Sequence, residues 1–124
     1  MNKVCVYGSL RKGMYNHVLM QNAIYLGDSE VQGSTLYDMG SFPRIALDHG
    51  ETSVKVEVYE VTEEQLTLLD RLEGYKSPTA DNFYDRAVVN TPYGQAYIYH
   101  IDGVNTEPVV ECGDWVQYLY GVAA

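Results

Sequence analysis

Residues 4–13, VCVYGSLRKG, form an apolar stretch that runs directly into a glycine–serine turn. The apolar residues stop abruptly at Gly8, which predicts a short buried strand over residues 1–7. Because glycine tolerates tight turns, the backbone N–H groups at Gly8 and Ser9 are expected to point outward, toward a ligand. The turn predicts one half of a binding site, and a reactive group has to come from elsewhere in the chain.

Residues 62–75, TEEQLTLLDRLEGY, predict a helix with well-defined ends. Thr62 is a favourable N-cap residue, and Gln65 three positions later completes a capping box. Gly74 supplies a stop signal. These signals fix the register of the helix to within about one residue.

Glu73 lies where an apolar residue is expected on this helix. When the side chains are placed around the helix axis at about 100° per residue, the apolar ones fall within one broad arc. Glu73 points in the same direction as this arc. The arc contains Leu66, Leu68, Leu69 and Leu72. Burial and the helix C-terminus both raise the pKa of a carboxyl group, which makes Glu73 a candidate general acid/base. The alternatives are that Glu73 reaches water, or that it pairs with Arg71 or Arg86.

The rest of the chain is rich in strand signals. Residues 53–61 alternate between apolar and polar side chains, and residues 84–90 and 95–101 flank a turn and predict a hairpin. Further elements are expected as strands over residues 31–39 and 44–47, a short helix over 14–24 ended by Gly27, and a terminal helix over 114–119 capped near Asp114. Since strands outnumber helices, we expect an α+β fold with a mixed or antiparallel sheet curled toward a small barrel.

Composition excludes several classes of partner. The chain has 124 residues, which predicts one domain over residues 1–124. The formal net charge is -9, so nucleic acid and anionic membrane surfaces are not expected partners.

No apolar run has the length of a transmembrane helix, and the N-terminus enters a strand without a signal peptide. Cys5 and Cys112 are expected as free thiols, and the protein as cytoplasmic.

Other catalytic constellations do not fit. The histidines His17, His49 and His100 have no metal-ligand spacing, so no metal and no cofactor are expected. The sequence around Ser9 lacks the G-x-S-x-G pattern of a hydrolytic nucleophile. The same loop also departs from the phosphate-binding motif, because Lys12 precedes Gly13.

Several motifs together resemble one known family. Residues 7–10, YGSL, and residues 69–74, LDRLEG, followed by YDR at 84–86, are similar to motifs of the gamma-glutamylcyclotransferase-like superfamily. This superfamily includes AIG2-like proteins, gamma-glutamylamine cyclotransferases and bacterial YtfP-like proteins. Residues 91–99 and 113–115 resemble the closing hairpin and tail of the bacterial members. The resemblance covers nearly the whole chain, with the motifs in the right order.

The resemblance implies a small mixed β-barrel of about six or seven strands with flanking short helices. It also implies that a γ-glutamyl amine or γ-glutamyl amino acid is converted to 5-oxoproline plus free amine. In this reading Glu73 is the general acid/base, and the loop of Tyr7, Gly8, Ser9 and Leu10 binds the glutamyl part through backbone groups.

Tyr84 and Tyr99 are expected as further substrate-binding residues in the pocket wall, and Arg86 as a structural residue. The leaving amine is not specified, and its recognition is expected in the loops at residues 76–82 and 101–113. The expected partner is a small-molecule γ-glutamyl substrate. The sequence does not determine the oligomeric state, and a monomer and a weak dimer are both open. The alternative function is a non-catalytic small-molecule-binding module of the same fold.

Overall fold

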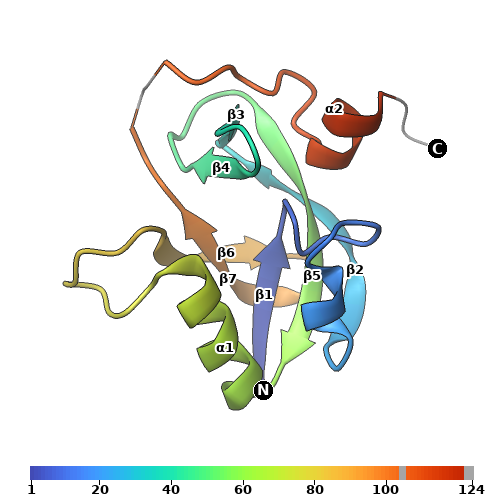
Figure 1. Ribbon diagram of the computed structural model, residues 1–124, viewed down its shortest axis with the longest axis vertical. Coiled ribbons are helices and arrows are strands. Elements are labelled where there is room, and N and C mark those ends of the chain that lie inside the picture. Colours follow the sequence, from blue (N-terminus) through green and yellow to red (C-terminus); the bar gives the residue numbers. More distant parts are fainter. Residues whose placement is uncertain (104–105, 122–124) are drawn as a thin grey trace.

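The computed structural model describes residues 1–103 and 106–121. Its main sheet has five strands in the order β2-β5-β1-β7-β6, and a second sheet pairs β3 with β4 (Figure 1). The strands are β1 (Asn2–Val6), β2 (Ile24–Gln32), β3 (Thr35–Asp38), β4 (Pro43–Ala46), β5 (Ser53–Val61), β6 (Asp85–Thr91) and β7 (Gly94–His100). The helices are the 3-10 helix η1 (His17–Met20), α1 (Glu63–Glu73) and α2 (Trp115–Tyr120).

The main sheet is mixed, which confirms the predicted α+β class. The central strand β1 pairs antiparallel with β5 and parallel with β7. The predicted hairpin is formed by β6 and β7 around the turn at residues 91–94. Strand β5 matches its predicted bounds at Ser53 and Val61.

The sheet does not close into a barrel, so that part of the expectation is wrong. Within the described residues, β2 and β6 are the two edges of the five-stranded sheet and no ladder joins them. The register of β2 shifts between Tyr25 and Gly27, and the Tyr93 ring of the β6–β7 turn lies directly against Gly27. At this point the β6–β7 turn meets β2 through a side-chain contact and not through a hydrogen-bonded ladder.

The helix predicted over residues 14–24 is also wrong. Only the single 3-10 turn of η1 forms there, and Ile24 already begins β2. Val18 and Leu19, which suggested an apolar helix face, are 62% and 52% exposed. Pairing of β2 with β5 along nearly its whole length outweighs the local helical pattern, and Gly27 lies inside β2 instead of ending a helix.

The predicted strand over residues 31–39 divides at Gly33, which has a φ of 71°. Such a left-handed conformation interrupts a strand, so the segment is shared between β2 and β3. The predicted strand at residues 44–47 is confirmed as β4, shifted by one residue. The terminal helix is confirmed as α2, with Asp114 as its N-cap.

The ends of α1 are those the sequence predicts. Thr62 accepts a hydrogen bond from the Gln65 amide, the reciprocal bond of the capping box is present, and Gly74 has a left-handed φ of 70°. The predicted apolar arc is too wide, because Leu66 and Leu69 are buried whereas Leu68 and Leu72 are exposed. Glu73 thus lies at the boundary between the core and a solvent-facing edge.

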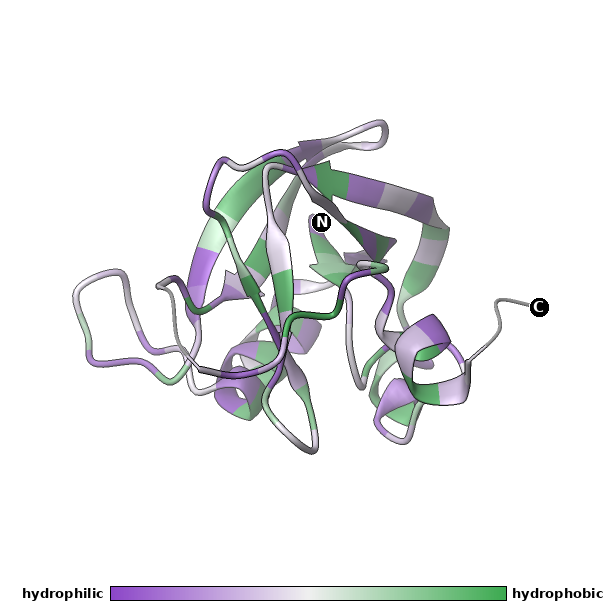
Figure 2. Ribbon diagram, turned by 90° about the horizontal axis from the view of Figure 1, so that it is seen from above, coloured by the Kyte–Doolittle hydropathy of each residue, from purple (hydrophilic) through white to green (hydrophobic). Residues whose placement is uncertain are grey.

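Apolar side chains pack on both faces of the main sheet. In the ribbon of Figure 2, strands of the sheet carry the hydrophobic segments, which are coloured green. Val54, Val56 and Val58 of β5 belong to one cluster with Trp115 of α2. Tyr59 and Val61 belong to the other cluster with Leu66 and Leu69 of α1. The two faces of β5 therefore hold α2 and α1 on opposite sides of the sheet.

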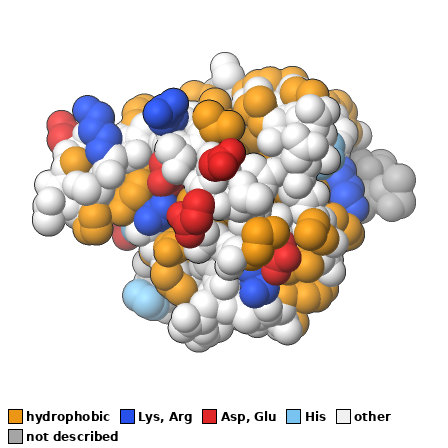
Figure 3. Space-filling model, turned by 90° about the horizontal axis from the view of Figure 1, so that it is seen from below, with side chains coloured by type: hydrophobic (Ala, Val, Ile, Leu, Met, Phe, Trp, Pro, Cys, Tyr) orange, Lys and Arg blue, Asp and Glu red, His pale blue; other side chains and the backbone are white. Residues whose placement is uncertain are grey.

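Charges on the face drawn in Figure 3 are intermixed. Lys and Arg side chains there lie singly among acidic, hydrophobic and uncharged groups. Of the helices that the structure describes, none has the length and apolar character needed to cross a membrane. Cys5 is buried, Cys112 is exposed, and both are free thiols.

Candidate active site

A pocket of about 200 Å³ opens where β1 ends. It is lined by Cys5, Val6, Tyr7, Gly8, Ser9, Leu10, Tyr15, Asn16, Phe42, Pro43, Leu72, Glu73, Phe83, Tyr84 and Tyr99. All of the residues predicted for the site are among these lining residues. The chain segments that bear the YGSL turn and the end of α1 meet here, although more than sixty residues separate them.

The loop after β1 is folded by its own hydrogen bonds. The Arg11 amide donates to the Gly8 carbonyl at 3.0 Å, and the Asn16 amide donates to the Ser9 carbonyl at 3.0 Å. The Asn16 side chain also donates to the Ser9 hydroxyl at 3.1 Å. Within the described part of the chain, the N–H groups of Gly8, Ser9 and Leu10 have no protein acceptor. They remain available to an anionic ligand.

Gly8 is required by the close approach of β4. A Cβ atom at this position would lie 2.7 Å from Cγ and 2.9 Å from Cδ of Pro43. No side chain fits at such distances, so glycine allows the loop to lie against the Pro43 ring. This contact sets the separation between two walls of the pocket.

Glu73 is the last residue of α1, and backbone bonds hold it against the start of β6. Its carbonyl accepts the Tyr84 amide at 3.1 Å, and the Gly74 carbonyl accepts the Phe83 amide at 3.0 Å. Burial raises the pKa of Glu73 from 4.5 to about 7. The carboxyl group therefore exchanges a proton near neutral pH, as a general acid/base requires.

Glu73 is not neutralised by the arginines that sequence reasoning offered as partners. Arg86 donates from Nη1 to both carboxylate oxygens of Asp70, at 3.0 and 2.8 Å. Arg71 is exposed. Among the residues that line the pocket there is no Lys or Arg side chain. Arg86 is a structural residue here, as expected, but it ties Asp70 and not Glu73.

The three tyrosines predicted for the site use their phenol protons inside the protein. Tyr7 donates to the Tyr99 carbonyl, and Tyr84 donates to the Pro43 carbonyl, each at 2.6 Å. Tyr99 donates to Asp70 Oδ1 at 2.6 Å. Burial is the main cause that raises the pKa of all three phenols, and the nearby charge of Glu73 contributes to each. The rings form the wall, and each phenol proton is already donated to a protein acceptor.

The rim of the pocket is apolar and was not found from the sequence. Tyr15, Leu72 and Phe83 line the pocket and are exposed. The Phe42 ring packs edge-on against the Phe83 ring at 6.0 Å. None of the described residues of the loops at 76–82 and 101–113 lines the pocket, and residues 104–105 of the second loop lie outside the described residues. The sequence signal that could have indicated this rim is Phe83, an aromatic residue directly before the Tyr84 motif.

Metal-ligating side chains do not gather in the structure as described. No group of three or more His, Cys, Asp or Glu side chains among the described residues has a metal-binding arrangement. The residues that line the pocket include three whose N–H groups have no acceptor among the described residues, one glutamate of raised pKa, and several aromatic side chains. This set suits a small carboxylate-bearing ligand and proton transfer.

Comparison with known proteins gives a consistent assignment. The family described as "Gamma-glutamyl cyclotransferase, AIG2-like" matches residues 4–117. The gamma-glutamylcyclotransferase family protein YtfP of Escherichia coli strain K12 is 35% identical over 118 residues, covering 92% of this chain and 96% of that protein. The gamma-L-glutamyl-butirosin B gamma-glutamyl cyclotransferase of Niallia circulans is 35% identical over 126 residues, covering 95% of this chain and 78% of that protein.

A solved structure is also similar. The crystal structure of a Pyrococcus horikoshii protein superimposes with a TM-score of 0.80 at 27% sequence identity. The match covers 98% of this chain and 95% of that chain. The similarity therefore extends over the pocket as well as the sheet.

Proposed function

The chain belongs to the gamma-glutamyl cyclotransferase, AIG2-like family, and from this premise we propose that it converts a γ-glutamyl amine or γ-glutamyl amino acid to 5-oxoproline and a free amine. The observation that carries the proposal is the position of Glu73. Glu73 lines the same pocket as Gly8, Ser9 and Leu10, whose N–H groups have no protein acceptor among the described residues. A proton-transfer group and an anion-binding loop are the two parts that this reaction needs.

The reaction is an intramolecular aminolysis. The α-amino nitrogen of the substrate attacks its own γ-carbonyl carbon, a new C–N bond forms, and the original amide C–N bond breaks. Glu73 takes a proton from the attacking nitrogen and delivers one to the departing amine. The overall charge and atom count are unchanged, and the carboxylate is regenerated in each turnover.

The loop supplies binding and charge stabilisation. The N–H groups of Gly8, Ser9 and Leu10 hold the α-carboxylate or the oxyanion that develops at the γ-carbonyl. The buried walls of Tyr7, Tyr84 and Tyr99 exclude water and hold the substrate folded for ring closure. The raised pKa of Glu73 supports this role, because proton transfer is most efficient when the pKa lies near the working pH.

The rim supports an apolar or aromatic leaving group. Tyr15, Leu72 and Phe83 present exposed apolar surface at the edge of the pocket. A carboxylate on the leaving group would meet no lining Lys or Arg, and would lie in the same pocket as Glu73. Among γ-glutamyl compounds, we therefore favour amides of amines over amides of amino acids.

The free thiols Cys5 and Cys112 support a cytoplasmic location.

The test is incubation of the purified protein with a panel of γ-glutamyl amides, followed by detection of 5-oxoproline. The panel contains γ-glutamyl derivatives of a small alkylamine, an aromatic amine, alanine and phenylalanine. Formation of 5-oxoproline from at least one compound supports the proposal. Binding of 5-oxoproline without turnover of any compound would favour the non-catalytic binding module instead.

A further inference from the structure

Arg11 belongs to the candidate anion-binding loop, but its side chain is not part of the pocket. The residue is only 5% exposed, and its guanidinium lies between two carboxylates from distant segments. Arg11 Nε donates to Glu57 Oε2 at 3.0 Å, and Arg11 Nη1 donates to Asp114 Oδ1 at 2.7 Å. The chain separation is 46 residues to Glu57 and 103 residues to Asp114. Arg11 therefore joins the loop to both β5 and the start of α2.

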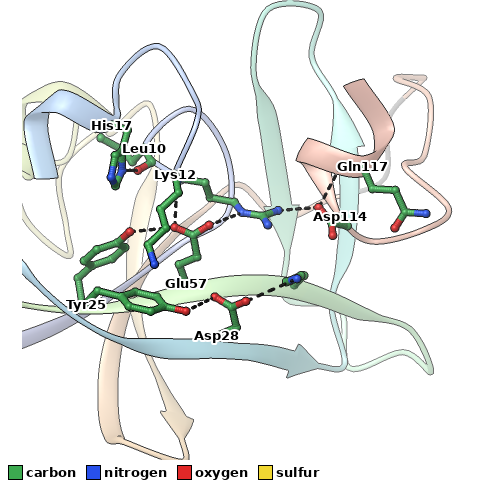
Figure 4. Close-up of polar contacts among 11 residues, drawn as sticks. Leu10, Lys12, His17, Tyr25, Asp28, Glu57, Asp114 and Gln117 are labelled. Carbon is green, nitrogen blue, oxygen red and sulfur yellow. Dashed lines mark hydrogen bonds and ion pairs between the residues drawn. The ribbon is translucent and has the colours of Figure 1, made fainter. Parts of the chain in front are cut away.

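Glu57 also binds the loop backbone. Its Oε1 atom accepts the Lys12 amide at 3.0 Å and the Tyr59 hydroxyl at 2.9 Å (Figure 4). Both of its oxygens are thus occupied by fixed donors. Two consecutive loop residues, Arg11 and Lys12, are fastened to one buried carboxylate of β5, which sequence alternation alone did not distinguish from a surface residue.

Asp114 fastens the same guanidinium to the C-terminal helix. It is the N-cap of α2, and its Oδ1 atom accepts the Gln117 amide at 3.1 Å (Figure 4). Although burial opposes it, the Arg11 hydrogen bond lowers the pKa of Asp114. Trp115, the next residue, is 1% exposed, so α2 is anchored in the core on the side of its N-terminus.

The cluster depends on the shape of the guanidinium. One cation faces two buried carboxylates through two different nitrogen atoms, a geometry that an arginine fork can satisfy. A lysine has the same charge, but its ammonium is a single point. It cannot occupy both positions, and one buried carboxylate would lose its cationic partner.

We propose that Arg11 is a positioning residue, which holds the loop so that the N–H groups of Gly8, Ser9 and Leu10 converge on the α-carboxylate of the substrate. This role rests on the proposed cyclotransferase function. The bonds from the Arg11 and Asn16 amides to the Gly8 and Ser9 carbonyls orient these peptide planes within the loop, and the bonds of Arg11 and Lys12 to Glu57 fix the loop as a whole to β5. Loss of the Arg11 bonds would leave the locally folded loop free to shift relative to β5 and α2.

The test compares Arg11→Lys with the wild type by calorimetric titration of 5-oxoproline and by steady-state kinetics on the best γ-glutamyl amide. We expect KM and the dissociation constant of 5-oxoproline to rise about tenfold or more, because misplaced donors lose charge-assisted bonds. The proton-transfer group is untouched, so kcat should change much less than KM. Unchanged KM and unchanged 5-oxoproline affinity would overturn the proposal.

Val31→Ala is the control for lost stability. Val31 is a buried residue of β2 that does not line the pocket, so this variant should lower the melting temperature without raising KM. An equal rise in KM for Val31→Ala would also overturn the proposal. Asp114→Asn provides a second variant if Arg11→Lys does not fold, since it keeps the Glu57 bonds and should give a smaller rise in KM.

The outcome for the wild type separates the two proposals. Wild-type protein that binds 5-oxoproline but forms none from the panel contradicts the cyclotransferase function and leaves the Arg11 comparison valid through binding. If the wild type turns over substrate and Arg11→Lys has the same KM and the same affinity for 5-oxoproline, only the positioning role is contradicted.

Discussion

Arg86 donates to both carboxylate oxygens of Asp70 from a single nitrogen, at 2.8 and 3.0 Å. The guanidinium also lies over the rings of Tyr75 and Tyr97, at 4.6 and 4.2 Å from their centroids. These contacts hold the end of α1 against the β6–β7 hairpin. Because Arg86 is paired with Asp70, it does not neutralise Glu73, which lies one helical turn after Asp70.

The raised pKa of Glu73 predicts how stability depends on pH. Its pKa is about 7 in the folded protein and near 4.5 in the unfolded chain, so the folded state retains a proton that the unfolded state releases. Relative to Glu73→Gln, the free energy of unfolding of the wild type should be highest below about pH 4.5. This advantage should be lost as the pH rises through 7. The change should be on the order of 1–3 kcal/mol, since Glu73 is partly exposed.

Urea denaturation of both proteins at pH 4.5, 6 and 8 measures this difference. Other titrating groups are common to the two proteins and cancel in the comparison. A difference in the free energy of unfolding that stays constant across this range would contradict the burial of the Glu73 carboxyl group.

Gly8→Ala should damage binding. The added methyl group would meet the Pro43 ring at 2.7 Å, so either the loop or β4 has to move. Overpacking of this kind costs about 1–3 kcal/mol, and we expect a lower melting temperature together with weaker binding of 5-oxoproline. Gly50→Ala is the matched control, because its nearest contact is the flexible Asp48 side chain at 3.2 Å. Wild-type affinity in Gly8→Ala would show that the loop tolerates displacement.

Tyr99→Phe should separate structure from catalysis. The Tyr99 hydroxyl already donates to Asp70 Oδ1 at an oxygen–oxygen distance of 2.6 Å, so its removal should cost about 1–2 kcal/mol of stability while turnover is largely retained. Tyr118→Phe removes a similar phenol–carboxylate bond to Asp38 at the surface, and should change stability less. A loss of kcat in Tyr99→Phe at unchanged stability would assign this hydroxyl to the substrate instead.

Phe83→Ala should change selectivity among leaving groups. The ring is 56% exposed at the pocket rim, where it can pack against an aromatic amine. Its loss should raise KM for a γ-glutamyl aromatic amide about fivefold, and change KM for a small alkylamide little. Leu119→Ala, an exposed apolar residue of α2 outside the pocket lining, serves as control. Equal effects of Phe83→Ala on both substrates would contradict a role in leaving-group recognition.

Local signals made α1 predictable and long-range pairing made the N-terminal segment unpredictable. The Thr62 cap, the Gln65 capping box and the Gly74 stop act within one helix, and all are present in the structure. Residues 14–24 carry a helical pattern, but β2 begins at Ile24 because it pairs with β5, which lies far away in the chain. A single sequence therefore shows local capping signals more fully than it shows which distant strands will pair.

The candidate site shows the same division. Glu73 and the YGSL turn were identified by position on a helix and by turn chemistry, and the structure brings them to one pocket. The burial of Glu57 could not be read from its alternating strand, because it depends on Arg11, 46 residues away. For the exposed rim, the aromatic Phe83 beside the Tyr84 motif was a local signal, but its place at the pocket depends on how the chain enters β6.

The most direct test of the account is the turnover number of Glu73→Gln on a γ-glutamyl amide that the wild type converts to 5-oxoproline. Glu64→Gln, at an exposed glutamate of the same helix, is the control and should retain wild-type kcat. The glutamine amide introduced by Glu73→Gln keeps the shape of the side chain but cannot exchange a proton. We therefore predict a decrease in kcat of about 10²–10⁴-fold with 5-oxoproline still bound. A Glu73→Gln variant with wild-type kcat would contradict the role of Glu73 as general acid/base.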